Sequence, residues 1–206
     1  MKLKFNFKNI DFKKIDWKYW WYEWIKPIII AAILALFIRT FIIQPFKIPS
    51  SSMYPTLRPG DRIFVSKFLY GARVPLLNLK FPEVREPKTG DIVVFLSHVE
   101  KKKYLVKRYI ARGPDTIQIK DGDIYVSGNR ITQAPFNKFR YYPRGEYGPS
   151  QREIKIPEGF FYVLGDNSAN SLDSRYWGFV PEKNLVGKAV VIHWPLNRMK
   201  ILKDGE

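Results

Sequence analysis

The pattern of hydrophobic and polar positions divides the chain into one apolar segment near the N-terminus and a long series of short apolar runs. Residues 27–38 contain no charged side chain, and with the flanking aromatic and apolar positions the apolar stretch covers residues 20–43. A helix that crosses a bilayer needs about 20 mostly apolar residues. The pattern therefore predicts one transmembrane helix over 20–43.

The residues before this helix are typical of a membrane anchor. Residues 1–26 contain seven lysines and three acidic residues, and six aromatic residues lie between Trp17 and Trp24. Aromatic side chains gather at membrane interfaces, and a lysine-rich flank stays in the cytoplasm. We expect residues 1–19 to be a basic cytoplasmic segment. Two alternatives are a buried core helix and a cleaved signal peptide, although the latter should end in small residues.

From residue 44 onward the pattern is typical of β-structure. Short runs of β-branched and aromatic residues alternate with Gly, Pro, Asp and Asn. The runs cover residues 62–66, 91–96, 104–110, 116–120, 123–127, 160–164 and 187–194. Asp121-Gly122 and Ser127-Gly128 are typical of hairpin turns, and the proline-rich residues 134–152 predict a loop excursion. The fold class predicted is mainly β, an antiparallel β-sandwich or open barrel over 44–206 preceded by one transmembrane helix.

The composition of the chain limits the kinds of binding partner and catalytic site that it can have. The chain has 35 Lys and Arg against 19 Asp and Glu, a net charge of +16, which indicates an anionic partner such as nucleic acid or an acidic membrane surface. It has no cysteine, which excludes thiol nucleophiles, disulfides and cysteine-ligated zinc. The two histidines, His98 and His193, leave little material for a metal site.

Three serines, residues 50–52, lie between two prolines directly after the predicted helix. A serine needs a base to become a nucleophile, and neither histidine lies in a distinctive motif. Lys107 lies in an apolar run, where burial would lower the pKa of its amine. Alternation places Arg108 on the opposite face of that strand and leaves open which face is inward. The alternatives are a polar linker around the serines and a lysine on a solvated face.

A third stretch, residues 165–181, is dense in Asp, Asn and Ser. Asp166, Asn170 and Asp173 could supply oxygen ligands for calcium. The stretch lacks the glycine and glutamate spacing of an EF-hand, so a turn-rich loop closed by an Asp173–Arg175 ion pair is favoured.

Together these stretches resemble the type I signal peptidases, the membrane-bound serine–lysine proteases that cleave leader peptides. The segments that carry the resemblance are residues 37–57, 90–95, 104–110 and 165–181, in the family's order. One departure follows the lysine strand: residues 112–115 read Arg-Gly-Pro-Asp, with Gly and Pro exchanged relative to the family's turn.

The resemblance implies a membrane-bound serine endopeptidase that removes N-terminal signal peptides from exported preproteins after A-x-A-like sites. Ser52 matches the nucleophile and Lys107 the general base. Ser50 and the Ser52 backbone N–H match the oxyanion hole, and Ser171 matches the hydroxyl that orients the lysine. Asp173 and Arg175 match a supporting ion pair. The matching substrate-pocket residues are Ile48, Met53, Leu57, Leu105 and Val106.

The resemblance also implies a location and partners. Residues 44–206 would be an extracytoplasmic catalytic domain on the outer face of the cytoplasmic membrane, with preproteins as substrates, membrane lipids as a contact surface and the secretion machinery as a transient partner. We expect no cofactor, no metal and no nucleic acid, because the anchor carries the domain away from the cytoplasm. The alternatives are a protease dedicated to one substrate and a non-catalytic, membrane-tethered β-domain that binds acidic lipid or a partner protein.

Overall fold

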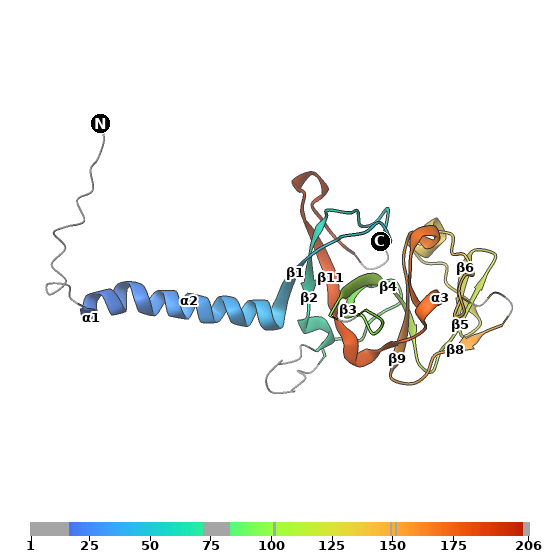
Figure 1. Cartoon of the computed structure of the whole chain (residues 1–206), viewed down its shortest axis with the longest axis horizontal. Helices are drawn as coiled ribbons and strands as arrows, with labels where there is room; N and C mark the ends of the chain where they lie inside the picture. The colour runs from blue at the N-terminus through green and yellow to red at the C-terminus, as the bar shows by residue number, and fades with distance from the viewer. Residues whose placement is uncertain (1–16, 72–82, 101, 149, 151, 204–206) are drawn as a thin grey trace. The chain divides into compact units, whose positions relative to one another are not determined.

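The structure is a computed structural model of the chain, and it describes residues 17–71, 83–100, 102–148, 150 and 152–203 (Figure 1). The chain forms two compact units, residues 1–39 and residues 40–206. The first is helical in its described part and the second is mainly antiparallel β-structure.

The helical unit contains α1 (Trp17–Trp20) and α2 (Lys26–Phe37), joined by a π-helical turn (Trp21–Ile25) and followed by a second one (Ile38–Ile42). The 21 residues from Trp17 to Phe37 have a mean hydropathy of 1.4, and none of the span is buried in the structure. Among the described residues this is the one helix long and apolar enough to cross a membrane. It agrees with the predicted N-terminal helix, although β-structure already begins at Ile43.

The larger sheet of the β-unit is a curled half-barrel of eight described strands, all paired antiparallel. Its order is β1-β2-β11-β3-β4-β9-β10, with β12 paired to β11. The strands are β1 (Ile43–Lys47), β2 (Arg62–Ser66), β3 (Ile92–Leu96), β4 (Tyr104–Arg112), β9 (Phe160–Leu164), β10 (Val180–Pro181), β11 (Leu185–Trp194) and β12 (Lys200–Ile201).

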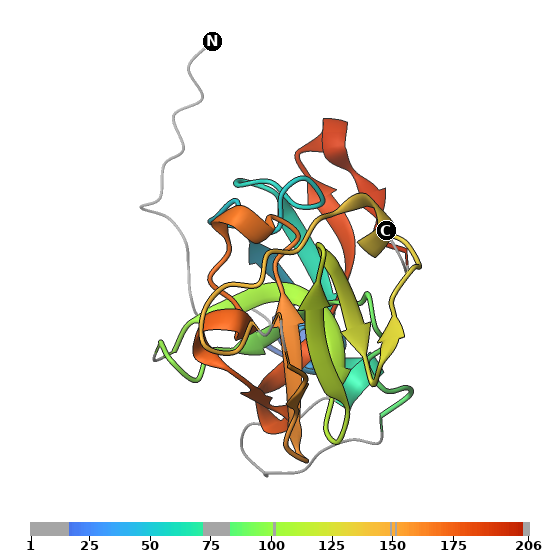
Figure 2. The same ribbon diagram turned by 90° about the vertical axis from the view of Figure 1, so that its right-hand side faces the viewer.

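A smaller antiparallel sheet has the order β7-β6-β5-β8 in the described part of the chain. Figure 2 views the β-unit from the side on which this sheet lies. Its strands are β5 (Thr116–Lys120), β6 (Asp123–Val126), β7 (Asn129–Arg130) and β8 (Ile154–Lys155). Short helical segments connect the strands: η5 (Phe68–Tyr70), η6 (Phe136–Lys138), η7 (Ser168–Asn170), α3 (Ser174–Trp177), η8 (Glu182–Asn184) and η9 (Leu196–Arg198).

The predicted mainly β fold is confirmed, and each of the seven predicted runs contains a strand. The two hairpin turns are also present, with positive φ at Asp121, Gly122, Ser127 and Gly128 as such two-residue turns require. The sequence did not reveal β1, β7, β8, β10 or β12. Four of these are two-residue strands, too short for a periodic signal, and β1 continues the apolar run of the helix.

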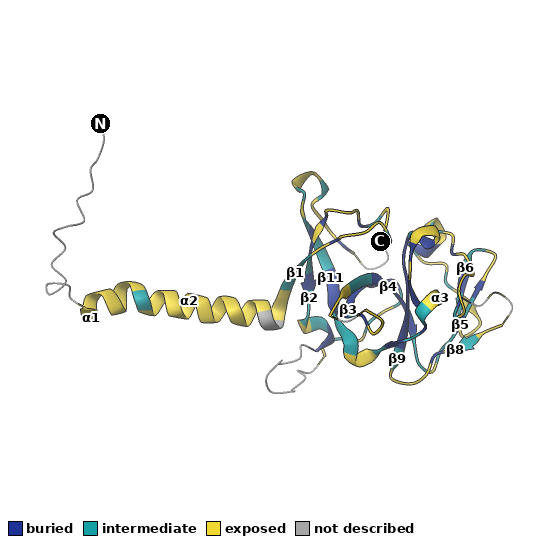
Figure 3. Ribbon diagram, in the orientation of Figure 1, coloured by how far each residue is buried: buried dark blue, intermediate teal, exposed yellow. Residues whose placement is uncertain are grey.

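Strand β4 is the centre of the β-unit because apolar clusters cover both of its faces. Val106 packs against one cluster, which includes Ile48 and Met53, and Leu105 packs against another on the opposite face. Ile110, further along β4, belongs to a third cluster beneath the smaller sheet. Figure 3 shows β3, β4 and β9 as largely buried strands. A side chain in the middle of β4 is therefore removed from water whichever way it points.

A buried carboxylate, Asp91, joins the start of β3 to its neighbours. It accepts hydrogen bonds from the Tyr70 hydroxyl at 2.6 Å and the Arg85 guanidinium at 2.9 Å, and Lys188 of β11 lies 2.8 Å away. Burial raises the pKa of Asp91, but the Arg85 and Lys188 side chains outweigh this effect and lower it to about 2. The carboxylate is thus charged and satisfied at neutral pH.

We predict that Asp91→Asn destabilises the β-unit by about 3 kcal/mol, because it removes the negative charge from a buried carboxylate that pairs with the Lys188 ammonium and the Arg85 guanidinium. Urea denaturation of the full chain in detergent, followed by tryptophan fluorescence, measures the free energy of unfolding. The control is Arg130→Ala, which breaks an exposed ion pair to Asp123 and should change that energy by less than about 0.5 kcal/mol. If the two substitutions changed the free energy of unfolding equally, the stabilising role assigned to the buried Asp91 carboxylate would be contradicted.

Candidate active site

The segment with the three serines is a packed loop between β1 and β2. Its ends are joined by backbone hydrogen bonds, from the Ile48 N–H to the Asp61 carbonyl at 2.8 Å and from the Gly60 N–H to the Ile48 carbonyl at 2.9 Å. The Asp61 carboxylate accepts from the Arg198 Nε at 2.8 Å, which ties the loop to the segment after β11. Met53 and Leu57 are buried beneath it. The loop is therefore a fixed element and not a linker.

Ser52 of this loop meets Lys107 of β4. The Lys107 Nζ and the Ser52 Oγ are hydrogen-bonded at 2.5 Å, and Lys107 is 4% exposed. Burial lowers the pKa of Lys107 to about 8, even though the Asp173 and Asp166 carboxylates act to raise it. The Ser50 Oγ lies 3.4 Å from the Ser52 Oγ on the exposed side of the pair. A hydroxyl and an amine that is largely deprotonated above pH 8 are thus in direct contact.

The residue after the lysine, Arg108, is also fully buried, so both faces of β4 are inward at this point. Its guanidinium forms a two-pronged ion pair with Asp166, with both N–O distances 2.6 Å. The Thr56 hydroxyl of the serine loop donates to the same carboxylate at 2.5 Å. Strand β4, the serine loop and the segment after β9 are thereby joined beside the Ser52–Lys107 pair.

Sequence reasoning missed this ion pair. Alternation places Arg108 opposite to Lys107 but gives it no partner, and the sequence indicates Asp166 only as a possible calcium ligand. The two residues are 58 positions apart, so no local spacing links them. The usable signal was an arginine inside an apolar run, because a charged residue is almost never fully buried without a partner.

The Asp173–Arg175 ion pair closes the other side of the same segment. Both side chains are fully buried, and the Arg175 Nε lies 2.8 Å from the Asp173 carboxylate. That carboxylate also accepts from the Gly165 N–H at 2.9 Å. Because Asp166 is engaged by Arg108, both candidate calcium carboxylates already bind guanidinium groups. The described residues contain no group of three or more His, Cys, Asp or Glu suited to a metal ion.

Ser171 lies in this segment next to the serine loop. A Cβ at Gly165 would collide with the Ser171 Oγ and with the Ser52 carbonyl oxygen, so only glycine permits the close approach of these groups. The Ser171 hydroxyl is buried, and within the described part of the chain it has no hydrogen-bond partner. The predicted contact with Lys107 is therefore not formed as a hydrogen bond here, and its lysine-orienting role stays a prediction.

Backbone contacts fix the serine loop against this segment as well. The Asn167 N–H donates to the Ser52 carbonyl at 3.0 Å, and the Asn167 side-chain amide donates to the Ser51 carbonyl at 3.1 Å. Asn167 thus joins the segment after β9 to two successive carbonyls of the serine loop.

A cleft of about 600 Å³ opens beside the Ser52–Lys107 pair. Of the predicted substrate-pocket residues, Ile48, Met53, Leu105 and Val106 line it. Leu57 is fully buried in the core below and is not among the described residues that line the cleft. The cleft also has lining residues that the sequence did not indicate: Phe46, Tyr104, Leu172 and Trp177.

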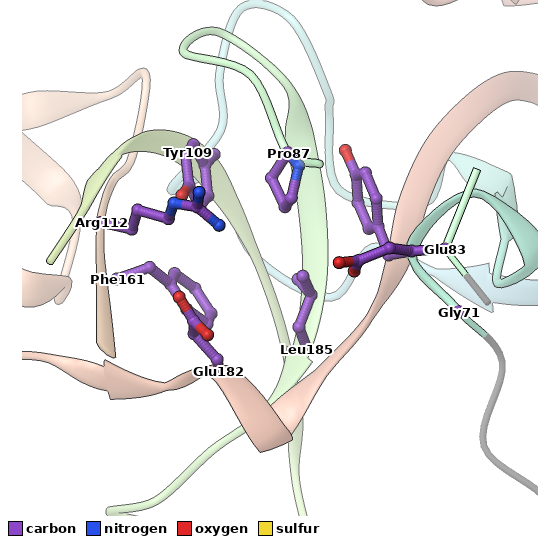
Figure 4. A pocket seen from close by; sticks show the side chains of 9 residues that line it. Gly71, Glu83, Pro87, Tyr109, Arg112, Phe161, Glu182 and Leu185 are labelled. Atoms are coloured by element: carbon purple, nitrogen blue, oxygen red, sulfur yellow. The ribbon is translucent and has the colours of Figure 1, made fainter. Parts of the chain in front are cut away.

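A second pocket, of about 80 Å³, lies at the side of the sheet where Tyr109 is buried (Figure 4). Glu83, Arg112 and Glu182 contribute charged side chains to it, and Arg112 is paired with Glu86 at 2.8 Å. Burial raises the pKa of Tyr109 far above its ordinary value. The pocket combines no nucleophile with a base, so the larger cleft is the candidate active site.

The histidines have other contacts. The Nε2 of His98 lies 3.3 Å from the Trp177 carbonyl oxygen, and the His193 ring stacks on Phe64 with centroids 4.1 Å apart. Neither residue lines the cleft among the described residues.

Comparison with known proteins places the chain among the peptidases. The family model described as "Signal peptidase, peptidase S26" matches residues 21–194. The chain therefore belongs to the signal peptidase S26 family.

Individual relatives agree with the family match. The protein named "Probable signal peptidase I-2" of Synechocystis sp. is 38% identical, with 89% of this chain and 78% of the relative covered. "Signal peptidase I T" of Bacillus subtilis is 35% identical, with coverage of 88% and 89%. "Signal peptidase I" of Bacillus licheniformis is also 35% identical, with coverage of 87% and 91%. In each case the aligned region covers most of this chain and most of the relative.

Proposed function

We propose that this protein is a signal peptidase I that removes N-terminal signal peptides from exported preproteins by a serine–lysine mechanism. Family membership supports the reaction class. The observation that carries the mechanism is the contact between the buried Lys107 amine and the Ser52 hydroxyl at the wall of the cleft. A hydroxyl with a base in hydrogen-bond reach is the arrangement that nucleophilic catalysis requires.

In the proposed mechanism, neutral Lys107 accepts the Ser52 proton as the Ser52 oxygen attacks the scissile carbonyl. The Ser52 N–H and the Ser50 hydroxyl stabilise the oxyanion, an effect worth about 3 kcal/mol per donor in other proteases. The Lys107 ammonium then donates its proton to the leaving amine. Water hydrolyses the acyl-enzyme with Lys107 again as the base, which restores both side chains.

The free edge of β4 supports binding of an extended peptide. Residues Tyr104 to Lys107 pair with β3 on one side, whereas β9 pairs with β4 only from Arg108 onward. Among the described residues no strand occupies the second edge of 104–107. A substrate strand can add there through backbone hydrogen bonds and present alternate side chains to the cleft.

Apolar side chains on one face of this edge support the proposed cleavage after A-x-A-like sites. Ile48, Met53 and Val106 close the space beside Ser52 with packed apolar side chains. The two alanines of such a site lie two residues apart, so in an extended chain both point to the same face. We propose that this packed apolar surface accepts the two small side chains of the site.

The two buried ion pairs act as positioning elements in this proposal. Arg108–Asp166 fixes the serine loop against β4, and Asp173–Arg175 shapes the segment that contains Ser171. Ser171, in that segment next to the serine loop, is proposed to orient the Lys107 amine, as the resemblance implies.

We predict that Ser52→Ala and Lys107→Ala each lower kcat/KM for a preprotein by at least about 10³-fold, because members of a nucleophile–base pair act as a unit. Lys107→Arg should not restore activity, since a guanidinium stays protonated. Cleavage of several unrelated preproteins by the purified full chain provides the measurement and also distinguishes a general enzyme from a dedicated one.

Matched controls are Ser51→Ala, next to the nucleophile, and Lys120→Ala, an exposed lysine on β5. For both control variants, kcat/KM for the preprotein should stay within about threefold of the wild-type value. Activity of Lys107→Ala near the wild-type value would exclude the dyad.

The topology proposed is a single membrane span with the N-terminus in the cytoplasm and the β-unit on the outer face, near lipid and in transient contact with the secretion machinery. The apolar helix and the lysine-rich residues before it support this orientation. Protease added to intact spheroplasts should digest the β-unit and leave an N-terminal fragment protected. If the β-unit were protected until the cells are lysed, it would lie on the cytoplasmic side, contrary to the proposed orientation.

A further inference from the structure

The cleft has a second apolar wall on the face of β4 opposite to Val106. We propose that this wall, made of Leu105, Leu172 and Trp177, is the subsite for the middle residue of an A-x-A-like cleavage site and selects a bulky apolar side chain there. The proposal rests on the proposed function. It adds a side-chain preference at x, the middle position, for which the two alanine positions give no preference.

The first step is that the two faces of the β4 edge are different surfaces. On one face Val106 packs with Ile48 and Met53, and the Tyr104 ring lies 5.3 Å from the Phe46 ring. These residues form the side assigned above to the two alanines.

On the other face Leu105 lies opposite Phe95 of β3 in the strand register. The Phe95 ring is 6.1 Å from the Trp177 ring, and both aromatic residues belong to the same apolar cluster as Leu105. Leu105, Trp177 and Leu172 all line the cleft.

The second step follows from the alternation of an added strand. A peptide on the free edge of residues 104–107 has the same two-residue period as β4. If the alanines of the site point to the Val106 face, the residue between them points to the Leu105 face. That side chain meets the wall of Leu105, Leu172 and Trp177.

The third step is that Trp177 is held in place while Leu172 is incompletely covered. Trp177 is fixed by Phe95 on one side and by His98, whose ring lies edge-on at 5.1 Å and whose Nε2 contacts the Trp177 carbonyl oxygen. Leu172 is 71% exposed, the largest exposed fraction among the described large apolar side chains. Covering such surface with an apolar side chain is favourable, because it removes both partners from water.

The charges at the rim explain why an apolar residue would be favoured over a charged one. Lys103 and Glu100 line the cleft but are paired with each other at 2.6 Å. A charged side chain at x would lose water against Leu172, and Glu100 and Lys103 already neutralise each other.

The test uses the purified full chain and a preprotein series identical except at x, where Leu, Phe, Gly or Lys is placed. Wild type should cleave the Leu and Phe substrates with kcat/KM about tenfold above the Gly substrate, the range that one or two apolar contacts provide. Leu172→Ala should reduce this ratio to about threefold or less. Leu172→Glu should raise the Lys substrate relative to the Leu substrate by about tenfold, since it places an opposite charge at the wall.

Leu196→Ala is the matched control, because Leu196 is 66% exposed on the turn after β11 and does not line the cleft. It should leave the ratio unchanged. Since each ratio compares two substrates on one enzyme, a general loss of activity cancels. The subsite proposal is overturned if wild type cleaves the Leu substrate with kcat/KM less than twofold above that for the Gly substrate. It is also overturned if Leu172→Ala and Leu196→Ala give the same ratio of these two values. In both cases the peptidase assignment stands. Failure of the folded wild type to cleave any member of the series overturns the proposed function itself.

Discussion

The burial of the Lys107 amine against Ser52 is the constraint on which the rest of the site depends. An amine exposed to water would be protonated at neutral pH and could not accept a proton. Here the half-barrel closes over both faces of β4, so that the lysine loses its hydration, and the pKa of Lys107 falls to about 8. Two carboxylates nearby act in the opposite direction, and burial outweighs them because each is already paired with an arginine.

The same pairing of charges assembles the site from distant parts of the chain. Arg108 and Asp166 join β4 to the segment after β9, and the Thr56 hydroxyl adds the serine loop to this pair. The other end of the serine loop is fixed by Asp61 and Arg198. Buried ion pairs add little to stability by themselves. Their contribution here is geometric, because each one specifies the approach of two segments to within hydrogen-bond distance.

The sequence predicted the β-class, the apolar helix and the approximate position of seven strands, because these depend on local patterns of apolar residues and turns. It also singled out Lys107 as a lysine in an apolar run. It could not reveal that Arg108 is buried too. Alternation assumes that one face of a strand is exposed to solvent, whereas both faces of β4 are buried in its middle. The partners of Arg108 and the second wall at Trp177 arise from contacts across more than 50 residues, which local spacing does not encode.

The pH dependence of kcat/KM for wild-type cleavage of a preprotein tests the central claim most directly. In the proposed mechanism only neutral Lys107 can act as the base, and burial lowers its pKa to about 8. The rate should therefore fall tenfold per pH unit below about pH 8 and level off above it. A profile that is flat from pH 6 to 9, or one that is still rising toward the ordinary lysine pKa of about 10.4, would contradict a buried neutral lysine as the base.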